Sequence, residues 1–139
     1  MATMGTLTCS DSAEVVYRIW MPEDGSVDAV LLILHGMAEH SARYDEFAKS
    51  LNTRGIAVYA PDHRGHGQTA LRNNAPMGWF AEKDGWQRVV NDALELANVI
   101  AGEYPQKPLF IMGHSMGSFL TRTLIAQNHR HVKFASHEH

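Results

Sequence analysis

The segment of the chain best suited to chemistry is Gly113-His114-Ser115-Met116-Gly117. The spacing Gly-x-Ser-x-Gly is typical of a nucleophile elbow, in which a serine projects from a sharp turn between a strand and a helix. Glycines two residues before and after the serine let neighbouring chain pass close to this strained turn. The helix that follows directs its N-terminus at the serine, which favours developing negative charge. We therefore predict that Ser115 is a nucleophile.

A second segment, His35-Gly36-Met37, could supply hydrogen-bond donors to the same chemistry. It follows an apolar run at residues 29–34, and the loop after such a strand contributes one N–H to an oxyanion hole in proteins with this elbow. The residue after the nucleophile contributes the other N–H. The predicted donors are the backbone N–H groups of Met37 and Met116. We interpret His35 as a structural residue that hydrogen-bonds loop backbone rather than as a proton-transfer group.

A third segment, Asp62-His63-Arg64-Gly65-His66-Gly67, is rich in histidine and could suggest a metal. Zinc sites need three or four ligands that converge from fixed spacings, and no second cluster in the sequence partners this one. We interpret the segment as a loop shaped by its glycines and tied down by Arg64 and Asp62. We predict neither a metal nor a cofactor, although four histidines near the end could bind metal adventitiously: His129, His131, His137 and His139.

The elements that must position these segments alternate between strand and helix. Apolar runs at 14–20, 29–34, 56–60 and 109–112 predict strands. Apolar residues at helical spacing predict helices over 44–51, over 86–101 and after the elbow, and a polar loop is expected from 61 to about 69. This alternation is typical of an α/β fold with a mostly parallel sheet and flanking helices. The polar segments follow the carboxyl ends of strands, where ligands bind in such sheets.

Composition narrows the class of protein. The 139 residues are 45% hydrophobic and 19% charged, with a formal net charge of −3, which suits one globular domain. The sequence has no basic stripe to favour nucleic acid, no apolar run of transmembrane length, and no secretory signal at its start. The single cysteine, Cys9, excludes an internal disulfide and is interpreted as incidental. We expect a soluble cytoplasmic protein.

Three segments together resemble one known family. Residues 35–44, 60–67 and 113–117 are similar in order and spacing to the monoacylglycerol lipase and lysophospholipase family of α/β hydrolases. The resemblance covers about residues 10–133. Ala38 and Ala42 stand where that family often has glycine, and Ser118 stands where a further glycine is usual.

The resemblance implies a serine carboxylic-ester hydrolase that acts through an acyl-enzyme on Ser115. Its substrates would be monoacylglycerols, lysophospholipids or small carboxylic esters. Peptidases of the iminopeptidase type share the fold and the elbow, so amide substrates stay open as an alternative. Dehalogenases and epoxide hydrolases would require aspartate at position 115, and the serine argues against them.

The end of the chain leaves the catalytic set incomplete. In this fold the acid and then the histidine follow the nucleophile, yet only 24 residues follow Ser115. We expect residues 1–133 to form the N-terminal portion of an α/β-hydrolase fold, without its lid and C-terminal half. Residues 131–136 could begin one more strand, and 134–139 form a tail of uncertain origin. His137, followed by Glu138, and His139 are not expected to act as the base. The alternative is a non-catalytic fragment, or a half that self-associates or pairs with a partner chain through an exposed sheet edge.

Overall fold

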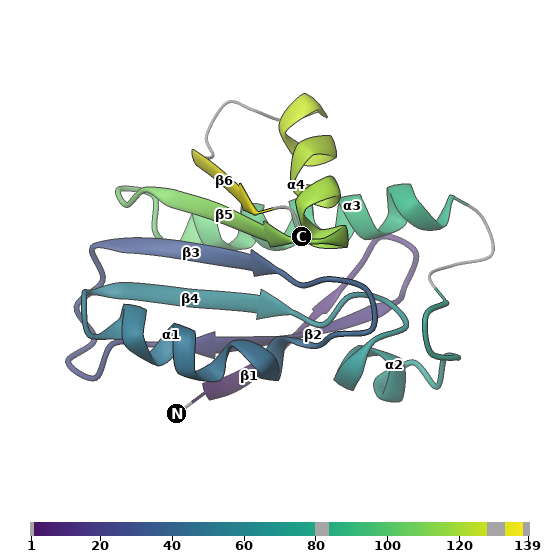
Figure 1. Ribbon diagram of the computed structural model, residues 1–139, viewed down its shortest axis with the longest axis horizontal. Coiled ribbons are helices and arrows are strands. Elements are labelled where there is room, and N and C mark those ends of the chain that lie inside the picture. The colour runs from purple at the N-terminus through teal and green to yellow at the C-terminus, as the bar shows by residue number, and fades with distance from the viewer. Residues whose placement is uncertain (1, 80–83, 128–132, 138–139) are drawn as a thin grey trace.

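The computed structural model describes residues 2–79, 84–127 and 133–137, and its strands form a six-stranded sheet in the order β1-β2-β4-β3-β5-β6 (Figure 1). The strands are β1 (Ala2–Thr8), β2 (Glu14–Trp20), β3 (Ala29–Leu34), β4 (Ile56–Pro61), β5 (Leu109–His114) and β6 (Lys133–His137). β2 pairs antiparallel with β1 and with β4, whereas β4, β3, β5 and β6 run parallel to one another. The predicted α/β class with a mostly parallel sheet is therefore confirmed.

Helices cover both faces of the sheet, as Figure 1 shows for α1 in front and α3 behind. The helical elements are the 3₁₀ helix η1 (Ser41–Tyr44), α1 (Asp45–Asn52), α2 (Gly67–Arg72), α3 (Gly85–Glu103) and α4 (Met116–Gln127). None of the described helices is both long enough and apolar enough to span a bilayer.

Strand β3 lies at the centre of the sheet and contributes to two separate hydrophobic clusters. Leu32 and Leu34 pack with side chains of α3 and α4 on one face, whereas Ile33 packs with Ala48 of α1 on the other. Successive side chains of a strand point to opposite faces, so a strand covered on both sides needs an unbroken apolar run. This double burial explains the continuous hydrophobic sequence of residues 29–34.

Two elements differ from the sequence prediction. β1 was not predicted, because its residues carry little alternation and only the hairpin with β2 makes it a strand. The loop expected to about residue 69 ends earlier, because α2 begins at Gly67. This helix was not predicted, because its six residues are too few to show an apolar stripe. The expected strand near 131–136 is present as the backbone of β6, whereas residues 131, 132, 138 and 139 lie outside the described residues.

Candidate active site

Ser115 lies at the turn between β5 and α4 and has an unusual backbone conformation. Its φ of 54° is in the left-handed region, which is rarely occupied by residues other than glycine and costs free energy. The turn is closed by Ser118, whose N–H and hydroxyl both donate to the Ser115 carbonyl, at 2.9 and 2.8 Å. A serine held in this strained turn between a strand and a helix has the backbone geometry of a nucleophile elbow.

The two glycines of the elbow have no room for side chains. A Cβ on Gly117 would collide with the backbone carbonyl of Leu34 at the end of β3. A Cβ on Gly113 would collide with the carbonyl of Gly117 and lie 2.5 Å from Thr121 Oγ1. Helix α4 therefore approaches the sheet backbone to backbone, and that approach places Ser115 at the carboxyl ends of the parallel strands.

The loop after β3 packs directly against the elbow. A Cβ on Gly36 would lie 3.1 Å from Ser115 Cβ and 3.2 Å from the His114 carbonyl oxygen. Met37 follows Gly36 in this loop, and Met116 begins α4 directly after Ser115. Among the described residues, neither Met37 N–H nor Met116 N–H has a hydrogen-bond acceptor. Met116 thus adjoins Ser115 in sequence, whereas Met37 follows Gly36, the residue that packs against Ser115.

Glu39 joins this loop to the elbow. Its Oε1 accepts hydrogen bonds from the Gly36 N–H at 2.7 Å and from the Tyr44 hydroxyl at 3.2 Å, and it lies 3.4 Å from His114 Nδ1. Arg43 forms an ion pair with the same carboxylate. Glu39 was not predicted as a site residue. Its position three residues after Gly36 is its local signal in the sequence, because His114 lies 75 residues away.

Three buried histidines lie beneath the loop. The rings of His35 and His63 are 4.0 Å apart, and those of His35 and His66 are 5.2 Å apart. His35 Nδ1 lies 2.7 Å from the Gly36 carbonyl oxygen, and His35 Nε2 accepts from the His63 N–H at 3.0 Å. Burial lowers the pKa of His35 to about 4 and the pKa of His63 well below its ordinary value. Both rings are therefore neutral at physiological pH.

Asp62 and Arg64 anchor the segment after β4. Asp62 accepts the N–H groups of Ser41 and Gln68, at 2.6 and 2.9 Å. The buried Arg64 guanidinium makes two hydrogen bonds to Asp92 on α3, at 2.6 and 2.9 Å, and two more to Asp11. Four charge-assisted hydrogen bonds thus connect this loop to α3 and to the hairpin between β1 and β2.

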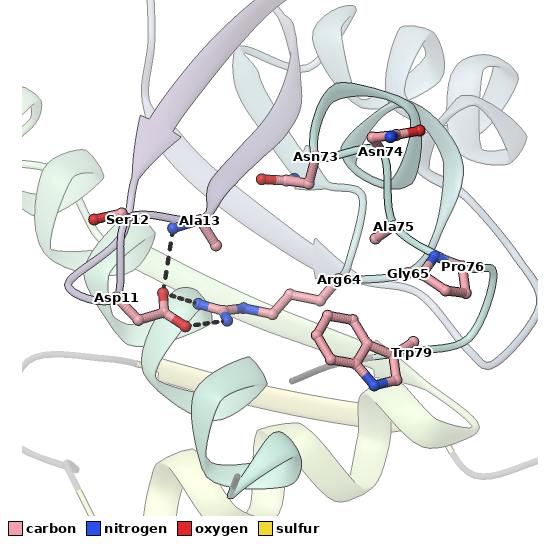
Figure 2. A pocket seen from close by; sticks show the side chains of 10 residues that line it. All are labelled: Asp11, Ser12, Ala13, Arg64, Gly65, Asn73, Asn74, Ala75, Pro76 and Trp79. Carbon is pink, nitrogen blue, oxygen red and sulfur yellow. Dashed lines mark hydrogen bonds and ion pairs between the residues drawn. The ribbon is translucent and has the colours of Figure 1, made fainter. Parts of the chain in front are cut away.

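A cavity of about 380 Å³ opens beside Arg64, and Figure 2 shows its lining. Asp11 and Arg64 pair along one side, and the Trp79 ring lies next to them. None of the residues that line this cavity belongs to the elbow or to the loop at 35–39. This cavity is therefore separate from Ser115 in its lining residues.

No hydrogen bond identifies a base for Ser115 among the described side chains. Within 2–79 and 84–127, no histidine ring or carboxylate hydrogen-bonds the Ser115 hydroxyl. Nor do any three histidine, cysteine or acidic side chains in the described part of the chain form a group that could hold a metal ion. Four histidines were considered above as an adventitious metal site or as a base. His129, His131 and His139 lie outside the described residues, and of His137 only the backbone is described.

The chain is similar over most of its length to known hydrolases. Residues 25–136 match the family model described as serine aminopeptidase, S33. The monoglyceride lipase of Rattus norvegicus is 34% identical over 125 residues, which is 90% of this chain and 39% of that protein. The monoacylglycerol lipase of Mycolicibacterium smegmatis is 35% identical over 103 residues, or 74% of this chain and 34% of that protein. The chain thus spans well under half the length of these relatives.

Solved structures share the same fold. A thermostable carboxyl esterase from Bacillus coagulans in complex with glycerol superposes with a TM-score of 0.88 at 27% identity, over 97% of this chain and 43% of that one. A soluble variant of monoglyceride lipase from Saccharomyces cerevisiae, bound to a substrate analog, gives a TM-score of 0.81 at 21% identity. That match covers 98% of this chain and 43% of the yeast chain. Because the sequence identity is low, this similarity is evidence for the fold alone.

Proposed function

The chain belongs to the serine aminopeptidase S33 family, which agrees with the resemblance of its three motifs to α/β hydrolases of the monoacylglycerol lipase type, and we propose that it carries the nucleophile of a serine carboxylic-ester hydrolase. The observation that supports this proposal most is the elbow itself. Ser115 has a φ of 54° at the start of α4 and lies against Gly36 of the loop after β3. Backbone strain of this kind is found mostly at functional sites, and a strained serine at the carboxyl edge of a parallel sheet is typical of a nucleophile elbow.

In the proposed mechanism, Ser115 Oγ attacks the ester carbonyl carbon and the C=O electrons move onto oxygen. The N–H groups of Met37 and Met116 form the oxyanion hole that stabilises this charge, and one such donor is worth about 10²–10³ in rate. Collapse of the intermediate releases the alcohol and leaves an acyl-enzyme, which water hydrolyses. The reaction also needs a histidine base, which takes the Ser115 hydroxyl proton and passes it to the leaving alcohol, and a carboxylate that orients this histidine. Neither group hydrogen-bonds Ser115 among the described side chains.

We propose monoacylglycerols as the substrate class, because relatives from rat and Mycolicibacterium smegmatis at 34 and 35% identity are named as lipases of these esters. The resemblance also implies lysophospholipids and small carboxylic esters, which should be tested as substrates beside the monoacylglycerols. The family description names an aminopeptidase, which favours aminoacyl amides as the second candidate.

A serine-directed probe tests the proposal. The 139-residue chain is incubated with a fluorophosphonate and, separately, with a p-nitrophenyl ester, a monoacylglycerol and a proline amide. Ser115→Ala should abolish labelling, whereas Ser50→Ala, which removes an exposed serine on α1, should leave it unchanged. Labelling that survives in Ser115→Ala would refute the assignment of the nucleophile. A wild-type chain that is not labelled would favour the non-catalytic alternative.

Two further expectations stay predictions. We propose a cytoplasmic location, which cell fractionation tests. We also propose that the chain self-associates or pairs with a partner chain through a sheet edge, and size-exclusion chromatography measures this. A monomer that unfolds cooperatively would contradict the second prediction.

A further inference from the structure

The loop after β3 contains a turn that its sequence does not favour. The Glu39 N–H donates to the Gly36 carbonyl at 3.3 Å, which closes a four-residue turn with Ala38 at its third position. Ala38 has a φ of 62°, in the left-handed region. Type II turns require a positive φ at that position and therefore favour glycine. An alanine there is strained, so other contacts must hold the turn in this shape.

The buried ring of His66 makes one of those contacts. Its Nε2 accepts a hydrogen bond from the Ala38 N–H at 3.1 Å, and its Nδ1 lies 2.8 Å from the Arg64 carbonyl oxygen. A backbone N–H can only donate and a carbonyl can only accept. Nδ1 of His66 therefore carries the proton, and Nε2 presents a lone pair to Ala38.

His35 repeats this arrangement at the other end of the turn. Its Nδ1 donates to the Gly36 carbonyl, and its Nε2 accepts from the His63 N–H. His63 in turn donates from Nε2 to the His35 carbonyl at 3.0 Å. The backbone at the first and third positions of the turn is thus held by two neutral rings in the same tautomer.

Two further histidines and an aspartate lie around His66. His35, at the end of β3, and His63, in the same loop as His66, face it with ring centroids 5.2 and 6.4 Å away. Asp62 and His40 flank the neighbouring Gly67, and both oxygens of Asp62 accept backbone N–H groups. Burial lowers the pKa of His35 and of His63, so these two neighbouring rings are neutral.

We propose that His66 is a positioning residue for the loop at 36–39: the lone pair on its Nε2 holds the Ala38 N–H, keeps the strained turn closed and thereby orients the N–H of Met37. Protonation of that nitrogen turns an acceptor into a donor. Two N–H groups then face each other, and the Ala38 peptide is released from the ring. The consequence for catalysis rests on the proposed function, because Met37 is an oxyanion donor only if Ser115 is the nucleophile.

Nuclear magnetic resonance of the full ¹⁵N-labelled chain tests the proposal without measuring activity. At neutral pH, His66 should show the Nδ1–H tautomer and a scalar coupling across the hydrogen bond between Ala38 N and His66 Nε2. On acidification, this coupling should disappear in step with protonation of His66. A His66 ring that carries its proton on Nε2, or a coupling that survives its protonation, would overturn the proposal. These measurements use the wild-type chain and need no variant to fold.

Hydrogen exchange of the Ala38 amide gives a second, independent readout. His66→Leu removes the acceptor and should speed exchange at Ala38 about tenfold, whereas His40→Ala, at an exposed histidine of the same loop, should leave it unchanged. Adding Ala38→Gly should restore the loop geometry of the His66→Leu chain, because glycine adopts a positive φ without strain. Unchanged exchange in His66→Leu would overturn the proposal. If the loop behaves as expected but fluorophosphonate does not label Ser115, the proposed function fails and the role of His66 in the loop stands.

Discussion

Gly117 provides the sharpest test of how the elbow is built. The substitution Gly117→Ala places a methyl group against the backbone carbonyl of Leu34, where no side chain can rotate away. Because β3 is the central strand and is packed on both faces, helix α4 has to retreat from the sheet instead. The perturbation therefore acts on the whole contact between α4 and the sheet.

The expected cost follows from what α4 buries. Met116, Leu120 and Leu124 are its buried apolar side chains, and each contributes about 2 kcal/mol through burial. A retreat of about 1 Å forfeits up to half of such packing, or about 3 kcal/mol in total. Alanine returns about 1 kcal/mol through its higher helix propensity. We expect a net loss of about 2 kcal/mol in the free energy of unfolding and a fall of about 7 °C in Tm.

Gly102→Ala is the matched control, because it makes the same substitution inside a helix. Gly102 lies in α3 with no atom within 4 Å of its Cβ position, so alanine should stabilise the chain by about 0.5–1 kcal/mol. Both variants are compared with wild type by urea and thermal unfolding, followed by circular dichroism. Equal stability changes in the two variants would show that the close approach of α4 to β3 is not what requires glycine at position 117.

Three other features give predictions of their own. Burial lowers the pKa of His35 from an unfolded value near 6.5 to about 4 in the folded chain. The corresponding stability, about 3 kcal/mol, is fully present above pH 6.5 and is lost as pH falls through 4; urea unfolding at pH 7, 5.5 and 4 measures it, and a flat profile would contradict it. Arg64→Met leaves the buried Asp92 unpaired and should cost about 3–5 kcal/mol, whereas Arg72→Met, at an exposed pair with Glu14, should cost less than about 1 kcal/mol in the same assay. Burial, reinforced by Asp92, raises the pKa of the Cys9 thiol, so iodoacetamide at pH 8 should modify Cys9 only after unfolding in urea; rapid modification of the folded chain would count against this environment.

The strands at the centre of the sheet were predictable because both of their faces are covered. β3 and β4 read as unbroken apolar runs for that reason, and the amphipathic pattern of α3 marks a helix with one buried face. β1 could not be predicted in the same way, because it is an edge strand that depends on its register with β2. α2 escaped prediction because six residues are too few to establish a helical period.

The candidate site was predictable only where chemistry imposes a local spacing. The elbow spacing located Ser115 and its glycines, because a strained turn must solve its steric problem with nearby residues. The partners of Glu39 and Arg64 carry no such signal. His114 is 75 positions from Glu39, and Asp11 is 53 positions from Arg64, so only the assembled sheet brings them together. Nor could the sequence show that Ala38 would adopt a positive φ.

The pairing of β3 with β5 has a kinetic consequence. Val30 and Leu109 are partners in this parallel ladder although 79 positions separate them, so a long loop must close before the ladder can form. Non-local pairing of this kind is slow, because the chain loses the entropy of loop closure before any contact of the ladder forms. The elbow follows β5 directly, and Gly117 of the elbow packs against the Leu34 carbonyl at the end of β3. We therefore expect the hairpin of β1 and β2 to form early in folding and the strained turn at Ser115 to form among the last steps.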